Sequence, residues 1–561
     1  MKKGKLTVLL LTILFIAIAV VFGRNEIGSR NFPFSVIVTA DGAEEEIFCM
    51  KIADAYYMFL PSYVNEQNAK IRTNFLYDVS IDGQRLKKDQ SCLDFPLNTE
   101  LELYFRSGNN EGYEAFTFVK SDQVATMYLD VPSGNMDYIH EKKGNAEPAS
   151  IRLYTEDGHL DFCGEAESFN GRGNGTWEAD KKAYSLKLLD EADLLGMGNA
   201  RRWILLSNSY DSSHVRNKVA YEMAAAVGAP FTPEVQWMDL YLNGEYAGLY
   251  LLSERNEVHP ERVNIDADRS FLVSVEPDWR LALQGYPYVQ TESGTAFRIH
   301  HGTLPSETMQ KIWQSAENAI FAEDGYDTAT GKRWDELIDV DSWAQKYLLE
   351  EVLANSDVGL ASEFFFYEET NGVIYAGPIW DMDISLKDSE EPWLSTRAII
   401  AGRPHLTDLT DRNYFYELLQ KPAFYDRVKE LYRTEFRPLL VQLLDGGLEV
   451  YSDKALPAAL ANQVRWQERD PEAGYQEIRE FLQKRMAFLD ACWLDGEVYF
   501  LVQVEQPNRV WAFAVFPGET LDFLPEPDSG TWYKSGTEEV LNRSLPVTSD
   551  LVIYGKNETP S

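Results

Sequence analysis

The spacing of apolar residues divides the chain into stretches that predict strands and stretches that predict helices. Between about residues 32 and 120, short apolar runs such as 34–39 and 115–119 are separated by turn signals such as Asp41-Gly42. This pattern predicts a small all-β module. We expect it to be a sandwich that serves as a spacer.

The central and C-terminal parts follow a different pattern. Strand signals continue to about Leu252, after which helical periodicity dominates, and residues 414–493 have apolar residues at helical spacing almost throughout. A β-rich block followed by a helical block predicts an α+β domain. After Gly496 the strand pattern returns, for example at 510–515, and predicts a second small β module. The expected organisation is an N-terminal segment (1–29), an all-β module (30–122), a central α+β domain (123–495) and a C-terminal β module (496–561).

The first residues predict a membrane segment. Lys2, Lys3 and Lys5 precede an uncharged apolar run from Leu6 to Gly23. At about 1.5 Å per residue, a helix of this length covers ~27 Å, close to the thickness of a bilayer core. The positive-inside rule then places the rest of the chain outside the cytoplasm. We expect an uncleaved signal-anchor, with a cleaved signal peptide and a secreted protein as the alternative.

The charge balance narrows the choice of partners. The chain has 52 Lys+Arg against 89 Asp+Glu residues, a net charge of -37 over 561 residues. This field repels phosphate backbones and anionic lipid heads, so it nearly excludes broad nucleic-acid binding and argues against docking on lipid heads. A small basic pocket for a nucleotide stays compatible with the sequence, because local charge can oppose the net charge.

The cysteines are too widely spaced for a CxxC metal or redox motif. Export makes a disulfide conceivable, and Cys49 with Cys92 is the pair to consider. Cys163 and Cys492 lie among apolar residues and are expected to be buried free thiols.

Common catalytic patterns are missing from the sequence. There is no GxSxG, HExxH or Walker A motif. The histidines are scattered, and the pair His300-His301 is expected at the solvated surface. A Ser-His or Cys-His enzyme therefore has little support.

One order of elements does indicate chemistry. An amphipathic helix is predicted over 339–351, followed by a polar loop with Asp357, a hairpin over 364–375, and then Asp381 and Asp383. This is the order of a kinase active site. There the loop aspartate positions or deprotonates the attacking hydroxyl, and the later aspartate holds Mg²⁺ on the nucleotide phosphates.

Asp381 and Asp383 are the candidate metal ligands. Mg²⁺ prefers hard oxygen ligands, with phosphates and waters completing its octahedron. Residues two apart on a strand point to one face, so both carboxylates could approach one ion. The alternative is an acidic pair on an exposed strand edge.

The β-rich block offers weaker candidates for phosphate contacts. Residues 171–177 are glycine-rich but lack GxGxxG order, and a tight turn explains them equally well. Lys187 faces opposite to Leu186 and Leu188, so it either touches phosphates or is solvated. Arg216, near a helix start, either binds an anion or ties the helix down.

Together these segments resemble the spore-coat protein H (CotH) kinase family, a group of atypical bacterial protein kinases. The resemblance covers roughly residues 127–386 and rests on the order and spacing of several blocks as a set. The blocks are 172–177, 181–184 with Lys187, 194–197, 203–206 with Asn208, Asp211 and 216–217, 239–246, 251–254, and 377–383.

The resemblance implies an ATP-dependent phosphotransferase acting on protein hydroxyls. It implies an α+β, two-lobed, atypical-kinase-like domain with a β-rich N-lobe and a helical C-lobe, flanked by the small β modules. The loop aspartate falls on Asp357 and the metal-binding aspartate on Asp381, with Asp383 as a second metal ligand. The residues expected to bind the cofactor are Lys187, Arg216 and Glu254.

Two features depart from the kinase pattern. Ser362 stands where ordinary kinases have an Asn, five residues after the catalytic Asp. Met382 stands between the two aspartates, where the family often has Phe, and residues 384–387 contain no Gly. A single-metal site or an inactive site is therefore an open alternative, as is Asp383 in the role of the missing Asn.

The sequence as a whole predicts an exported, membrane-tethered kinase. It would use ATP with Mg²⁺ or Mn²⁺ to phosphorylate Ser or Thr hydroxyls of a spore-coat or cell-surface protein. Two alternatives stay open: an inactive kinase-like scaffold, and a carbohydrate-binding surface protein. Nucleotide binding separates the first function from the other two.

Overall fold

The computed structural model describes residues 29–387, 396–527 and 530–555. The predicted anchor, residues 6–23, lies outside these ranges. Within them, no helix combines the length and apolar character needed to cross a bilayer. Helices and strands are both abundant in the described chain, which confirms the α+β class.

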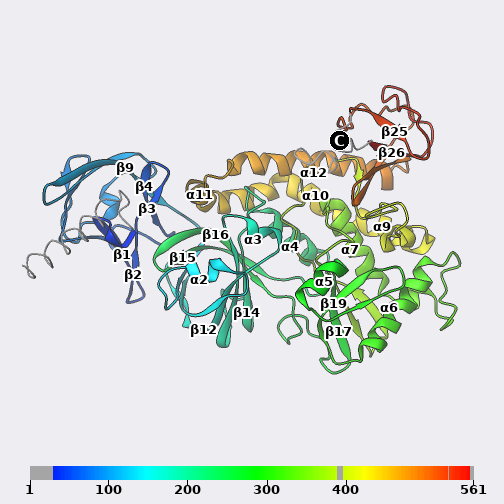
Figure 1. Ribbon diagram of the computed structural model, residues 1–561, viewed down its shortest axis with the longest axis horizontal. Helices are drawn as coiled ribbons and strands as arrows, with labels where there is room; N and C mark the ends of the chain where they lie inside the picture. Colours follow the sequence, from blue (N-terminus) through cyan, green and yellow to red (C-terminus); the bar gives the residue numbers. More distant parts are fainter. Residues whose placement is uncertain (1–28, 388–395, 528–529, 556–561) are drawn as a thin grey trace, which may run out of the picture.

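The N-terminal part of the molecule consists of two β-sheets around one core (Figure 1). The smaller sheet has the order β2-β1-β5 and the larger one the order β3-β4-β9-β8-β6-β7. Side chains such as Val36 and Ile71 from the first sheet share a core with Met58 and Phe116 from the second. The strands are β1 (Phe34–Ala40), β2 (Ala43–Ile47), β3 (Met50–Ile52), β4 (Ala55–Leu60), β5 (Ala69–Thr73), β6 (Asp78–Ile81), β7 (Gln84–Arg85), β8 (Leu101–Ser107) and β9 (Asn110–Lys120).

The four cysteines are free thiols. Cys49 and Cys92 are both buried in the N-terminal core, and burial raises the pKa of the Cys49 thiol well above its usual range. Cys492 is buried as predicted, but Cys163 is exposed. The prediction that Cys163 is buried was wrong. Successive side chains of a strand alternate between its two faces, and Cys163 lies in the first half of β12, where side chains are largely exposed.

A closed barrel follows, in the order β10-β11-β12-β13-β14-β16-β15. It closes through a parallel pairing of β10 with β15, whereas the other neighbours are antiparallel. Alternate residues, for example Leu153, Leu186 and Leu240, fill the interior. On the outside, Tyr241 packs into the N-terminal core and Leu251 into the core shared with the sheet and helices. The elements are β10 (Ala125–Asp130), α2 (Asp137–Glu141), β11 (Ala146–Tyr154), β12 (Leu160–Arg172), α3 (Gly175–Glu178), β13 (Ala183–Asp193), β14 (Asn199–Leu206), α4 (Arg216–Ala226), β15 (Val235–Leu242) and β16 (Glu245–Glu254).

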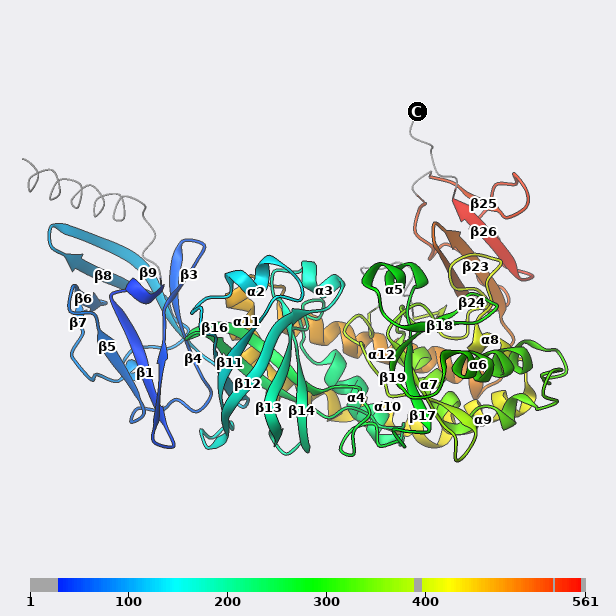
Figure 2. The ribbon, with the colours of Figure 1, turned by 60° about the horizontal axis from the view of Figure 1, so that its bottom comes forward.

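Next to the barrel stands a five-stranded sheet of order β18-β19-β17-β20-β21 (Figure 2). The predicted helix before Asp357 is confirmed as α7, whose first turn is capped by Asp339 accepting the Ser342 N–H at 2.8 Å. The predicted hairpin is confirmed as β20 and β21. The elements are β17 (Ser270–Val275), α5 (Asp278–Gln284), β18 (Tyr288–Gln290), β19 (Ala296–Gly302), α6 (Ser306–Phe321), α7 (Val340–Leu353), β20 (Glu363–Glu368) and β21 (Val373–Ala376).

Helices α8 to α12 confirm the helical pattern of residues 414–493. The long helices α11 and α12 run along the molecule, and α11 contacts barrel strand β16 (Figure 1). They are followed by a sheet of order β22-β24-β23-β26-β25, whose strand β22 comes from before the helices. The elements are β22 (Ala398–Ile399), α8 (Tyr414–Leu419), α9 (Pro422–Leu431), α10 (Arg437–Gln442), α11 (Leu448–Trp466), α12 (Pro471–Trp493), β23 (Phe500–Gln506), β24 (Arg509–Val515), β25 (Trp532–Lys534) and β26 (Leu551–Gly555).

A fully buried ion pair joins α7, α12 and the strand β22 segment. Arg485 Nη2 of α12 donates to Glu351 Oε1 of α7 at 2.7 Å, and both side chains have zero exposure. Glu351 also accepts the N–H groups of Ile400 and Gly402, at 2.9 and 2.8 Å. Arg485 donates to the Ala398 carbonyl at 2.7 Å. Each charge is therefore fully hydrogen-bonded, which offsets the cost of its burial.

Replacing Arg485 by Met should destabilise the protein strongly, because it leaves the Glu351 carboxylate buried without its partner. The expected loss in unfolding free energy is about 3–5 kcal/mol, measured by urea titration. The matched control is Lys311→Met, whose partner Glu307 lies 2.7 Å away on the surface, with side chains 74% and 77% exposed. That change should leave the free energy of unfolding nearly unchanged, because solvent screens an exposed pair. Equal losses in both variants would contradict this view of the pair.

Candidate active site

A polar cavity of about 1000 Å³ lies between the outer face of the barrel and the five-stranded sheet. Barrel strands β12, β13 and β14 form one wall, and β19, β20 and α5 contribute to the other. Asp357, Asp381 and Asp383 line it together, so the structure brings the predicted catalytic and metal-binding residues into one cavity.

The loop after α7 fixes the backbone of Asp357. Its N–H donates to Asn355 Oδ1 at 3.2 Å, and its carbonyl accepts the Leu360 N–H at 2.9 Å. Asn355 is buried and donates in turn to Glu350 Oε2 of α7 at 2.7 Å. Asp357 lines the cavity, and Arg509 Nη2 lies 3.4 Å from its Oδ1.

Asp381 occupies a turn, not a strand. Its φ of 64° is in the left-handed region, which non-glycine residues rarely adopt outside turns and strained sites. Tyr221 and Asn217 of α4 hold this turn: the Asp381 N–H lies 3.3 Å from the Tyr221 hydroxyl, and the Met382 N–H donates to Asn217 Oδ1 at 2.9 Å. The prediction of a strand here was wrong, because tertiary bonds to α4 override the local preference for extended backbone.

The carboxylates of this turn lie close enough to oppose each other's ionisation. Burial first, and the neighbouring Asp381 charge second, raise the pKa of Asp383 to about 8. Burial and then Asp357 raise the pKa of Asp381, although Ser362 Oγ donates to Asp381 Oδ2 at 3.0 Å. A cation at this end of the cavity would relieve the repulsion.

The donor chemistry suits a divalent ion that arrives with phosphates. In the described part of the chain, no three His, Cys, Asp or Glu side chains are grouped to hold a metal by themselves. Mg²⁺ commonly takes only one or two protein carboxylates and completes its shell with phosphate oxygens and waters. Asp381 and Asp383, with oxygen ligands on one turn, fit that requirement.

The cavity is also lined by arginines that come from both of its walls, Arg172 from β12 and Arg298 from β19. Arg172, Arg255 and Arg298 line it, and among the described residues none of them has a carboxylate within ion-pair distance. Burial lowers the pKa of Arg172, and the guanidinium lies 5.4 Å from the Trp380 ring centre. Burial also lowers the pKa of Arg255, and Arg298 stacks on Tyr286 at 3.6 Å. Guanidinium groups without counter-charges form a site for a polyanion.

Sequence reasoning missed most of these cations. Arg172 carried a signal, since it stands in the glycine-rich run, but glycine backbone was given the phosphate role. Arg255 and Arg298 carried none, because they belong to separate elements that only the fold brings together. His300 also lines the cavity; its Nε2 lies 2.8 Å from Ser274 Oγ, and burial lowers its pKa to about 3. The prediction of a solvated surface pair was wrong for His300.

The residues predicted to bind the cofactor lie outside the cavity. Lys187 is on the outer barrel face, 2.8 Å from Glu167 Oε1. Arg216 is buried at the start of α4, 2.5 Å from Asp211 Oδ1, and so ties the helix down. Glu254 is buried 2.5 Å from Arg262, and burial raises its pKa to about 7. Each has a partner of opposite charge and none of them lines this cavity, whose cationic lining residues include Arg172, Arg255 and Arg298.

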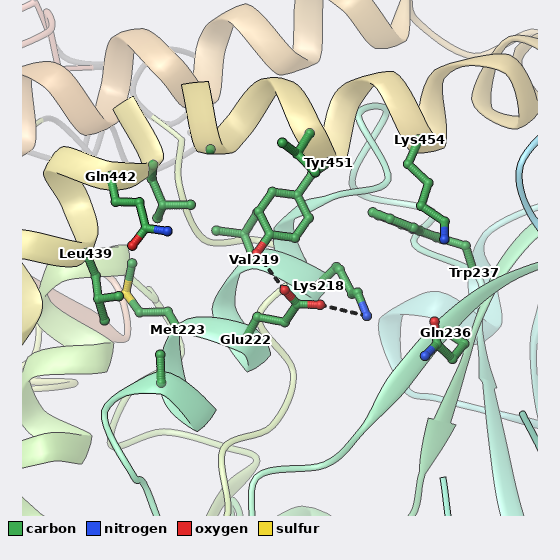
Figure 3. A pocket seen from close by; sticks show the side chains of 14 residues that line it. Lys218, Val219, Glu222, Met223, Gln236, Trp237, Leu439, Gln442, Tyr451 and Lys454 are labelled. Atoms are coloured by element: carbon green, nitrogen blue, oxygen red, sulfur yellow. Dashed lines mark hydrogen bonds and ion pairs between the residues drawn. The ribbon is translucent and has the colours of Figure 1, made fainter. Parts of the chain in front are cut away.

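Helix α4 also borders a second cavity, of about 520 Å³ (Figure 3). Tyr451 of α11 donates to Glu222 Oε2 at 2.6 Å, and Lys218 pairs with Glu222 Oε1 at 2.8 Å. Apolar side chains of α4 and α10, including Met223 and Leu439, cover its other end. Helix α4 therefore contacts the Asp381 turn with one face and this cavity with another.

In a comparison with known protein families, residues 169–489 match a family model described as CotH kinase protein. The matched range contains the three aspartates and the three arginines of the cavity. It ends before β23 and β24. No curated protein matches the chain.

The cavity arginines, Arg172, Arg255 and Arg298, should bind inorganic tripolyphosphate without any metal. Replacing Arg298 by Met removes one charged donor and should weaken this binding by roughly 10–100-fold, because hydrogen bonds to charged groups contribute about 1.5–3 kcal/mol. Isothermal titration calorimetry measures the affinity. Arg72→Met is the matched control, since Arg72 pairs with Glu46 at 3.2 Å in the N-terminal module. An unchanged affinity of Arg298→Met would show that the polyanion binds elsewhere.

Proposed function

The chain belongs to the CotH kinase protein family, and on this premise we propose that it transfers the γ-phosphate of ATP to a protein Ser or Thr hydroxyl. The observation that carries the proposal is one cavity lined both by the three aspartates and by Arg172, Arg255 and Arg298, which have no carboxylate within ion-pair distance among the described residues. A nucleoside triphosphate with a divalent ion has the matching charges: anionic phosphates for the arginines, and a cation for the aspartates.

The arrangement of the central domain supports a two-lobed kinase-like architecture. In this proposal the barrel with α4 is the N-lobe, and the five-stranded sheet with the helices after it is the C-lobe. The cavity lies between them, where kinases bind their nucleotide. The turn that carries Asp381 is bonded to α4 on one side and to Ser362 on the other, so it joins the two lobes.

Asp381 and Asp383 would hold Mg²⁺ or Mn²⁺. The ion, when bound, neutralises charge that develops on the phosphates during transfer. Arg172, Arg255 and Arg298 would orient the phosphate chain through charge-assisted hydrogen bonds. Asp383 occupies the second-metal role that Asn fills in ordinary kinases, since Ser362 is already engaged with Asp381.

Asp357 would act on the acceptor. Its carboxylate accepts the proton of the Ser or Thr hydroxyl while the hydroxyl oxygen forms a bond to the γ-phosphorus. The bond between that phosphorus and the β–γ bridging oxygen breaks, and ADP leaves with the electron pair. Positioning and charge stabilisation provide most of the acceleration in such transfers.

The proposed setting is outside the cytoplasm. The apolar run at residues 6–23, preceded by lysines, would tether the chain to the membrane with the catalytic domain exported. The acceptor is then a spore-coat or cell-surface protein. A second candidate function is an inactive kinase-like scaffold, which is favoured by Ser362 in place of the usual Asn. This function replaces the first if no phosphate transfer occurs with any metal.

Replacing Asp381 by Ala should abolish metal-dependent ATP binding and leave the fold intact. Ala provides no oxygen for the ion, and phosphates that bind without the ion are repelled by Asp383. Calorimetry should show that Mg²⁺ no longer raises the affinity for ATP above the metal-free affinity that the arginines provide, while circular dichroism is unchanged. Asp341→Ala is the control, because Asp341 is 62% exposed and pairs with Arg427. Wild-type affinity in Asp381→Ala would move the metal site elsewhere, with Asp383 tested next.

Replacing Asp357 by Asn should preserve ATP binding and remove most phosphate transfer. Asn keeps the size but takes no proton and carries no charge, so transfer should fall by about 10²–10⁴-fold. Labelled ATP with the full-length protein and added acceptor proteins measures the rate, alongside melting temperature and ATP affinity. A rate that falls only as the folded fraction falls would make Asp357 structural, and a wild-type protein inactive with Mg²⁺ and Mn²⁺ would refute the kinase proposal.

A further inference from the structure

The Asp357 carboxylate has a partner from a distant part of the chain. Arg509 Nη2 lies 3.4 Å from Asp357 Oδ1, with the two side chains 28% and 41% exposed. Among the interactions of the described residues, this is the contact that the Asp357 carboxylate makes. Arg509 is the first residue of β24 in the C-terminal sheet, which stands at the same end of the molecule as α7 (Figure 2). It lies beyond residues 169–489.

A stack of side chains sets the position of Arg509. Its guanidinium lies 5.0 Å from the ring centre of Trp511, and that of Arg403 lies 5.9 Å from the same ring. Trp511 is buried, and Arg403 is fully buried. Arg403 donates to the Val358 carbonyl at 3.3 Å, directly after Asp357 in the chain. The stack therefore holds the loop at two adjacent residues, once through its backbone and once through the Asp357 carboxylate.

Backbone bonds fix β24 against the catalytic domain. Strand β22 pairs with β24 in the register Ala398↔Phe513. The Val510 N–H donates to the Leu406 carbonyl at 3.1 Å, next to Arg509. Strand β22 is itself bound by Arg485 through the Ala398 carbonyl, at 2.7 Å. These bonds fix the backbone at Arg509, so its side chain starts from a defined position.

The acidic groups near Asp357 indicate why its contact with Arg509 matters for the orientation of the carboxylate. Asp381 and Asp383 line the same cavity as Asp357, so its carboxylate stands near other acidic groups. A free Asp357 carboxylate would turn away from them. Arg509 instead binds it in one orientation through a planar guanidinium. A partly exposed pair contributes little to overall stability, so stability alone does not account for the contact.

We propose that Arg509 is a positioning residue that orients the Asp357 carboxylate toward the acceptor hydroxyl, so that the C-terminal β module completes the active site. This inference rests on the proposed kinase function. It assigns the module a part in the reaction in addition to its packing against the helices.

The test compares Arg509→Gln with wild type in the full-length protein. The kcat for phosphate transfer should fall by about 10–100-fold, because a small misplacement of a catalytic group has effects of this size. The affinity for ATP with Mg²⁺ and the melting temperature should be unchanged. Arg509→Lys, which keeps the charge but loses the planar fork, should recover part of the rate. Lys534→Gln in the same module is the control, since Lys534 pairs with Glu539 at 2.6 Å on the surface.

A double variant isolates the coupling between the two residues. If Arg509 acts through Asp357, Arg509→Gln should cause no further loss in the Asp357→Asn background. An equal further loss there, or a kcat of Arg509→Gln at or above the wild-type value, would overturn the inference while the kinase function stands. If Arg509→Gln fails to fold, Arg509→Lys provides the test instead. A wild-type kcat in Arg509→Lys although the pair is weakened, together with no coupling to Asp357→Asn, would also overturn the inference. A wild-type protein that transfers no phosphate refutes the kinase function and this inference with it.

Discussion

Repulsion among the carboxylates of Asp357, Asp381 and Asp383 is the constraint on which the candidate site depends. Like charges in a poorly solvated cavity resist ionisation, as the raised pKa values of Asp381 and Asp383 show. The fold keeps them together by bonding the backbone around them, through Asn217 and Tyr221. Arg172 and Arg298 line the same cavity from its two walls and have no carboxylate within ion-pair distance in the described part of the chain. In the proposed function, a metal with phosphates would complement both sets of charges.

Contacts elsewhere in the molecule hold the elements around this site in place. The buried pair of Arg485 and Glu351 ties α7 and α12 to β22, so the loop after α7 starts from a fixed point. Strand β22 carries the C-terminal sheet, and that sheet places Arg509 against Asp357. A chain of contacts thus runs from the helical core to the acceptor side of the cavity. The site is assembled from elements far apart in the sequence, each held by its own backbone bonds.

The sequence predicted what is local and missed what the fold assembles. The helix before Asp357, the hairpin and the order of the aspartates are short-range patterns, and all three are present. Lys187, Arg216 and Glu254 were chosen for their local setting, but each is neutralised by a partner that sequence spacing does not reveal. The left-handed backbone at Asp381 depends on α4, and Arg255 and Arg298 meet only across elements. The membership of β22 in the C-terminal sheet is equally non-local.

The central claim is that Asp381 and Asp383 hold a divalent ion on the phosphates of a nucleotide facing the arginines. Crystals grown with Mn²⁺ and a non-hydrolysable ATP analogue test it most directly, because Mn²⁺ gives an anomalous diffraction signal. The account predicts an anomalous peak within coordination distance, about 2–2.5 Å, of a carboxylate oxygen of Asp381 or Asp383, with phosphate density between it and Arg172. Nucleotide bound with Mn²⁺ away from both aspartates would contradict it.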